Sequence, residues 1–149
     1  MTVIKGWHCA YEIHYHIVFP VKYRRALMRP EVEQELVRIA SEINERYDIE
    51  IEQMGADKNH IHLLCSAHPK VSIGNIVRVY KSITARELFR TFPDLKKELW
   101  GGEFWSDGYY AATVGQRNNW ETVYKYVKNQ GVEHTQSLRR FAQLPLPGR

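Results

Sequence analysis

Cysteine is scarce in this chain: Cys9 and Cys65 are the two cysteines among 149 residues. Two cysteines cannot build a disulfide framework, and neither belongs to a CxxC pair. Long apolar runs are also missing, since no stretch of about 18 apolar residues occurs, and we expect no membrane-spanning helix. No apolar segment follows a basic start at the N-terminus, as a secretory signal would require. We therefore expect a reduced, cytoplasmic protein.

A strong excess of charge of one sign is absent as well. Lys and Arg number 21 against 17 Asp and Glu, which gives a formal net charge of +4. This modest excess permits a nucleic-acid partner without demanding one. Hydrophobic residues make up 44% and charged residues 26%, and no repeat or low-complexity tract occurs. The composition and length predict one soluble domain over residues 1–149.

Hydropathy periodicity predicts alternating strands and helices. Strand patterns cover residues 8–19, 49–54, 60–67 and 104–114, the last interrupted at Asp107 and Gly108. Helical spacing covers residues 30–47, 72–92 and 118–130, with Ser72 as the N-cap of the second helix. The order β-α-β-β-α-β-α is the split β-α-β pattern of ferredoxin-like (RRM-like) folds plus a C-terminal helix. We expect an α+β fold with one antiparallel sheet and helices on one face.

A pair of histidines opens the predicted strand 60–67. Side chains alternate along a strand, so His60 and His62 project from one face, roughly 6–7 Å apart. Two imidazoles in this position can share a metal ion, although the spacing alone equally fits two unrelated histidines. His14 and His16 have the same spacing, and parity does not decide between the pairs. The second pair opens an apolar strand just after a predicted turn over residues 55–59. This context favours His60 and His62, because a site at a strand end can meet solvent.

A third metal ligand is not found near this pair in the sequence. Cys65 points to the other face of the strand, and His68 lies about 20 Å further along an extended chain. Neither residue can join an ion whose ligand bonds are about 2.0–2.2 Å long. The third ligand must therefore come from another element.

The last predicted helix carries a phenol and a carboxamide one turn apart. Tyr126 and Gln130 lie at the edge of an apolar stripe that includes Tyr124 and Val127. Both side chains can face a neighbouring surface without entering the core. From these residues alone, a packing border and a helix end are the more common explanation.

Four blocks of the sequence, in this order, carry a family resemblance. They read YHIVF followed by KYRR (15–25), NHIHLL (59–64), LWGGEFWSDGYY (99–110) and YKYVKNQ (124–130). Over nearly its whole length the chain resembles the TnpA-type single-tyrosine HUH transposases, where HUH denotes His, a hydrophobic residue and His. This family serves the smallest, hairpin-ended bacterial and archaeal insertion sequences.

The resemblance implies a role for each motif. Tyr126 would be the nucleophile, and His60, His62 and Gln130 would hold a divalent ion, Mg²⁺ or Mn²⁺. The protein would cut and rejoin single-stranded DNA through a 5′-phosphotyrosine and recognise hairpins. It would form a homodimer in which the catalytic helix can dock on the HUH strand of the other copy. The family often has Asp where Asn59 stands, which puts the orientation of His60 in doubt.

Basic residues near these motifs are candidates for contacts with DNA phosphates. Each is as readily a solvated surface charge, and exposed aromatic side chains are candidates for stacking on unpaired bases. We expect salt to weaken DNA binding strongly. The candidate residues are Lys22, Arg24, Arg25, Arg78, Lys81 and Arg86.

Three other functions compete with a transposase. A domesticated HUH nuclease acting on repeated palindromic hairpins would share the fold, the ion and the nucleophile. A non-catalytic RNA- or DNA-binding module is the alternative from another class, because split β-α-β sheets often carry stacking aromatics. A zinc hydrolase is disfavoured, since we expect no acidic ligand or acidic general base near the histidine pair.

Overall fold

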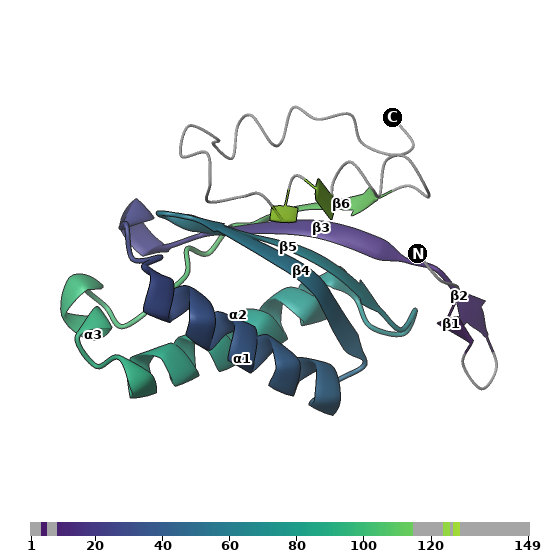
Figure 1. Ribbon diagram of the computed structural model, residues 1–149, viewed down its shortest axis with the longest axis horizontal. Helices are drawn as coiled ribbons and strands as arrows, with labels where there is room; N and C mark the ends of the chain where they lie inside the picture. The colour runs from purple at the N-terminus through teal and green to yellow at the C-terminus, as the bar shows by residue number, and fades with distance from the viewer. Residues whose placement is uncertain (1–3, 6–8, 115–123, 126, 129–149) are drawn as a thin grey trace.

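The computed structural model describes residues 4–5, 9–114, 124–125 and 127–128. A four-stranded sheet forms one layer, and helices α1 and α2 form a second layer on one of its faces (Figure 1). The elements, in chain order, are β1 (Ile4–Lys5), β2 (Ala10–Tyr11), β3 (His14–Pro20), a 3₁₀ turn (Lys22–Arg24), α1 (Pro30–Arg46), β4 (Ile49–Asp57), β5 (His60–Ala67), α2 (Ile73–Thr91), α3 (Leu95–Glu98) and β6 (Tyr110–Val114).

The order of the strands is β4-β5-β3-β6, and every neighbouring pair is antiparallel. Helix α1 connects β3 to β4 with β5 between them, and α2 connects β5 to β6 with β3 between them. This is the split β-α-β arrangement, so the predicted ferredoxin-like α+β fold is confirmed. Among the described residues, no helix is long and apolar enough to cross a membrane.

The core lies between the sheet and the helices. All eight residues of β5 are buried, and Ile61, Leu63 and Cys65 belong to the core cluster on the helix side. Pro30 starts α1, where its missing N–H costs no helical hydrogen bond. Ser72 caps α2 as predicted, because its Oγ accepts a hydrogen bond from the backbone N–H of Asn75 at 3.1 Å. The helix α3 was not predicted.

The N-terminal strand is shorter than predicted. It starts at His14 rather than at residue 8, because Ala10 and Tyr11 pair with β1 in a separate two-stranded ladder. The predicted strand 104–114 is present in two parts. Trp105 bridges to Val21, and β6 begins only at Tyr110.

Strand β4 is longer than predicted and contains a bulge. Ile51 pairs with Cys65 and Gln53 pairs with Leu64, so Glu52 is an extra residue on this strand. The bulge reverses the alternation, which turns the residues after it to the opposite face from the one simple parity would give. The predicted turn 55–59 is instead mostly strand, and Asp57 pairs with His60.

The predicted C-terminal helix 118–130 is described in part. Residues 124–125 and 127–128 are helical, and Figure 1 places them on the face of the sheet opposite to α1 and α2. Tyr124 is half-buried and Val127 is fully buried. Tyr126 and Gln130 lie outside the described residues.

Candidate active site

Four histidines lie on the sheet face opposite to the helices, and all four are buried. His14 and His16 come from β3, and His60 and His62 come from the adjacent β5. The expectation that the second pair meets solvent at the strand end is therefore wrong. The two pairs that the sequence left as alternatives form one cluster.

His16 and His62 share a hydrogen bond. His16 Nε2 lies 3.2 Å from His62 Nδ1, and the two rings are parallel within 2°. With the shared proton on His62 Nδ1, the Nε2 atom of His62 keeps its lone pair, as a metal ligand requires. His16 then orients His62 instead of competing with it as a ligand.

His60 is oriented by its neighbour Asn59. The two side chains are joined by a hydrogen bond of 2.8 Å between His60 Nδ1 and Asn59 Oδ1. A carbonyl oxygen only accepts, so Nδ1 carries the proton and Nε2 keeps its lone pair. Nε2 is buried and has no hydrogen-bond partner among the described residues. The asparagine side chain thus fixes the orientation of the His60 ring.

The two candidate ligands are close and neutral. The ring centroids of His60 and His62 are 4.9 Å apart. Burial lowers the pKa of His62 to about 2, with His16 and His60 adding to the shift, and burial lowers the pKa of His16 to about 3. Burial also lowers the pKa of His60, where Arg24 adds to the shift and Asp57 opposes it. Neutral imidazole is the form that binds a metal ion.

An acidic residue does lie beside the histidine pair, contrary to expectation. Asp57 is buried and pairs with His60 across the β4–β5 ladder, because the bulge at Glu52 turns it to this face. The sequence predicted a turn at this position and not the end of a strand, so this neighbour was missed. In the part of the chain that the structure describes, however, no group of three His, Cys, Asp or Glu could hold a metal ion. The predicted third ligand, Gln130, lies outside that part.

Two further contacts around the cluster were not predicted. His14 Nδ1 donates to the Glu52 carboxylate at 2.7 Å, so the bulge residue holds the end of the histidine row. The ring of Tyr110 in β6 meets His16 edge-on, with centroids 5.9 Å apart. Both contacts join residues far apart in the chain, so only the strand order brings them to the cluster.

Three of the predicted DNA-binding residues follow β3 and lie near His60. Pro20 pairs with His60, and the backbone N–H of the next residue, Val21, donates to the Asn59 carbonyl at 2.8 Å. The candidates Lys22, Arg24 and Arg25 continue from this point. The segment that carries these three candidates therefore starts beside the histidine strand, while the side chains of Lys22 and Arg25 pair with Glu103 and Glu98.

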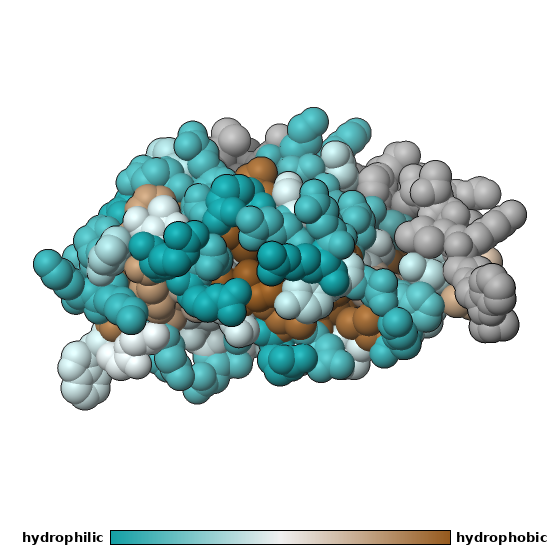
Figure 2. All heavy atoms as spheres, turned by 90° about the horizontal axis from the view of Figure 1, so that it is seen from below, coloured by the Kyte–Doolittle hydropathy of each residue, from teal (hydrophilic) through white to brown (hydrophobic). Residues whose placement is uncertain are grey.

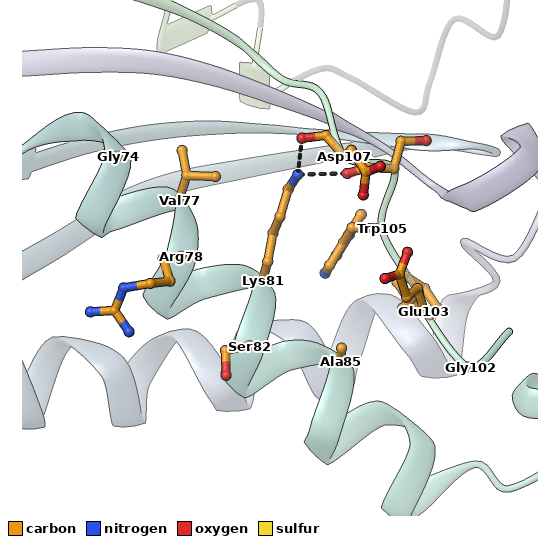
Figure 3. A pocket seen from close by; sticks show the side chains of 12 residues that line it. Gly74, Val77, Arg78, Lys81, Ser82, Ala85, Gly102, Glu103, Trp105 and Asp107 are labelled. Carbon is orange, nitrogen blue, oxygen red and sulfur yellow. Dashed lines mark hydrogen bonds between the residues drawn. The ribbon is translucent and has the colours of Figure 1, made fainter.

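The other three candidates lie on α2, in the helix layer. Lys81 Nζ donates to the carbonyls of Ser106 at 2.6 Å and Asp107 at 3.2 Å, as Figure 3 shows, and to that of Gly108 at 3.3 Å. An ammonium has three donors, so these carbonyls use all of them. Lys81 and Arg78 both line a cavity of about 460 Å³ between α2 and residues 102–107.

Arg86 lies in the same helix layer, away from the histidine cluster. Its Nε is 3.7 Å from the Glu87 carboxylate. The view of this side in Figure 2 is mostly hydrophilic, with a hydrophobic patch near its centre. The α2 candidates therefore belong to the opposite side of the sheet from the histidines.

Comparisons with known proteins agree on one family. Residues 9–130 match the family described as "Transposase IS200 like". The ISDra2 transposase TnpA of Deinococcus radiodurans is 35% identical over 126 residues, which cover 85% of this chain and 89% of that protein. The transposase for insertion sequence element IS200 of Salmonella typhimurium is 32% identical over 142 residues, covering 95% of this chain and 88% of that protein.

Solved structures share the fold. The crystal structure of a Deinococcus radiodurans protein assigned as a transposase superposes with a TM-score of 0.69 at 30% identity, covering 86% of this chain and 98% of that one. A REP-associated tyrosine transposase bound to a REP hairpin superposes with a TM-score of 0.62, covering 89% of this chain and 75% of that one. Its identity of 12% supports likeness of fold alone.

Metal-free protein should lose stability as the pH falls from about 6.5 toward about 3. Folded His16 and His62 stay neutral because of their lowered pKa values, whereas the unfolded chain takes up protons at these residues below about pH 6.5. Acid therefore favours unfolding throughout this window, and the stabilisation is fully present above it. Urea unfolding in EDTA from about pH 7 to about pH 4 measures the effect. His16→Asn should flatten the dependence, and equal slopes for both proteins would contradict this account.

Proposed function

The chain belongs to the IS200-like transposase family, and on that premise we propose that it cuts and rejoins single-stranded DNA through a covalent bond to Tyr126. One observation carries the proposal. His60 and His62 sit on one buried face, with each Nδ1 engaged by a hydrogen bond and each ring neutral. A pair prepared in this way suits a metal-assisted phosphoryl transfer better than a structural core.

The phenol of Tyr126 is the proposed nucleophile. With an ordinary pKa near 10, a phenol is a weak nucleophile at neutral pH and needs help to attack phosphorus. Its oxygen bonds to phosphorus and loses its proton, while the bond to the 3′-oxygen breaks and that oxygen leaves as a 3′-OH. The 5′-phosphotyrosine conserves the energy of the phosphodiester. A second 3′-OH can therefore reverse the step and join strands without ATP.

His60, His62 and Gln130 are the proposed ligands of a divalent ion, Mg²⁺ or Mn²⁺. When bound, the ion would neutralise phosphate charge and polarise the phosphorus centre. The residues present fit this role, because the buried Nε2 of His60 lacks a hydrogen-bond partner among the described residues. All three ligands are neutral, so oxygen atoms of the DNA phosphate would complete the coordination shell.

Exposed aromatic side chains beside the basic segment support a single-stranded substrate. Trp100 is 85% exposed and Tyr23 is 55% exposed, and the Tyr23 hydroxyl donates to the Trp100 carbonyl at 3.1 Å. Solvent-exposed rings next to Lys22 and Arg25 offer stacking surfaces for unpaired bases of a DNA hairpin. A nucleic-acid partner explains why a large apolar ring is left in water.

A homodimer acting in the prokaryotic cytoplasm, on the nucleoid when bound to DNA, completes the proposal. The domesticated HUH nuclease remains the second candidate, because the fold likeness extends to a tyrosine transposase that binds a REP hairpin. Imperfect palindromes close to both ends of the gene would favour the transposase. Palindromes dispersed over the chromosome would favour the nuclease.

Replacing Tyr126 by Phe should abolish the covalent protein–DNA adduct and leave folding and hairpin binding intact, because only the nucleophilic oxygen is removed. Tyr124→Phe is the matched control, since Tyr124 is half-buried beside the fully buried Val127. Labelled single-stranded DNA from the flanks of the gene, incubated with Mn²⁺ and run on a denaturing gel, reads out the adduct. An adduct formed by Tyr126→Phe would overturn the assignment, and no adduct from the unmodified protein would favour a non-catalytic binding module.

Mn²⁺ should support adduct formation at a lower concentration than Mg²⁺, because imidazole ligands suit Mn²⁺ better. Asn59→Ala should raise the half-saturating Mn²⁺ concentration about 10- to 100-fold, by removing the partner that orients His60. Asn59→Asp keeps a hydrogen-bond acceptor for His60, so its half-saturating Mn²⁺ concentration should stay close to that of the unmodified protein. Titrations of adduct yield with each ion test both points. Equal half-saturation by the two ions would count against the proposed ligands.

Mixing inactive variants tests whether each site is shared between two copies. Tyr126→Phe subunits lack the nucleophile, and His60→Ala subunits lack a metal ligand. If the helix of one copy docks on the strand of the other, a heterodimer contains one intact site and cleavage should partly return. No recovery in a mixture shown by native mass spectrometry to contain heterodimers would mean that each subunit builds its own site.

A further inference from the structure

The segment after β3 has an unusual backbone. Tyr23 and Arg24 adopt φ values of 59° and 53°, so two consecutive residues with side chains lie in the left-handed region. Glycine is the residue that adopts this region without steric cost, and strain of this kind concentrates at functional sites. A purely structural turn would be better served by glycine at either position.

The strained turn is fixed to the strand that carries the histidine pair. The Val21 N–H donates to the Asn59 carbonyl, and the Arg24 N–H donates back to the Val21 carbonyl, both at 2.8 Å. Asn59 is also the residue that orients His60. Two hydrogen bonds thus connect the backbone of Arg24 to the residue beside the candidate metal ligand.

The basic side chains around this turn differ in whether they form ion pairs. Lys22 pairs with Glu103 at 2.9 Å, Arg25 with Glu98 at 2.8 Å, and Arg29 with Asp94 at 2.9 Å. Each of these ion pairs joins the turn, or the segment that follows it, to residues 94–103 and so stabilises the conformation of the turn. Arg24 is exposed and has no carboxylate partner among the described residues.

We propose that Arg24 binds the scissile phosphate of the DNA beside the His60–His62 pair. This inference rests on the proposed function and deepens it by assigning one charge of the basic segment to the reacting group. The ligands of the proposed ion are neutral, so they bring no positive charge of their own to the phosphate. A guanidinium can bind two phosphate oxygens at once and stabilise charge that develops during the displacement. Lys22, Arg25 and Arg29 instead hold the turn in place.

Arg24→Gly separates this role from a structural one. Glycine relieves the left-handed strain, so the thermal midpoint should stay the same or rise. The single-turnover rate of adduct formation at saturating DNA should nevertheless fall by about 10²-fold or more, the loss typical of removing one charge-stabilising donor. Arg24→Lys keeps the charge without the two-pronged geometry and should recover part of the rate.

Arg46→Gln is the matched control. It removes the same charge from an exposed position at the end of α1, where the described residues provide no ion pair. The adduct rate should be unchanged. If Arg46→Gln slows the reaction as much as Arg24→Gly does, net charge is responsible and the assignment of Arg24 fails.

A neutral methylphosphonate at the cleaved position, located by mapping the adduct, tests the contact directly. Ordinary hairpin DNA should bind the unmodified protein more tightly than it binds Arg24→Gly. The methylphosphonate DNA should bind both proteins equally, because the charge that Arg24 meets is gone. An unchanged difference between the two proteins would overturn the inference. Normal adduct formation by Arg24→Gly would also overturn the assignment of Arg24 but would leave the proposed function intact. If the unmodified protein forms no adduct, both the proposed function and the assignment of Arg24 are wrong.

Discussion

The antiparallel pairing of β3 with β5 is the constraint on which the rest of the site depends. It sets Val18 opposite His62 and Pro20 opposite His60, which brings the histidines of the two strands onto one face. The same register places the start of the basic turn at the end of the HUH strand, where Val21 bonds to Asn59. A slip by one residue would turn His60 and His62 into the helix-side core and separate them from His16.

Sequence periodicity was enough for the overall fold, because the main strands of the sheet and the two long helices have strong local signals, whereas the short elements β1 and α3 do not. The buried strand β5, the apolar stripe of α1 and the Ser72 cap of α2 are properties of short segments, and each is present as expected. The order of these strands and helices along the chain then predicted the split β-α-β topology. The short pairing of Ala10 with Lys5 ended the first strand early, and that contact has no periodic signal.

The assignment of His60 and His62 as metal ligands stays a prediction, and the sequence did not show what orients them. The HxH spacing could not assign a role to His16, because the parity of a residue gives its face of the sheet but not its neighbour on the next strand. Asp57 was missed for a different reason, since the strand was predicted to end at residue 54 and Asp57 was assigned to a turn, whereas β4 continues to Asp57. The contacts of His16 with His62 and of Asp57 with His60 depend on pairing between strands, whereas the His60–His62 spacing can be read along one strand.

The charge balance of the site explains why its histidines are buried. Four buried imidazoles are tolerated because hydrogen bonds to Asn59, Glu52 and between His16 and His62 satisfy one nitrogen of each ring. The lowered pKa values of His16, His60 and His62 keep these three rings free of competing protons, yet they also deprive them of positive charge. A phosphate approaching this face must therefore find its positive partners elsewhere. The proposed ion supplies one, and a cation at the rim, fixed by backbone and not by a carboxylate, supplies the other.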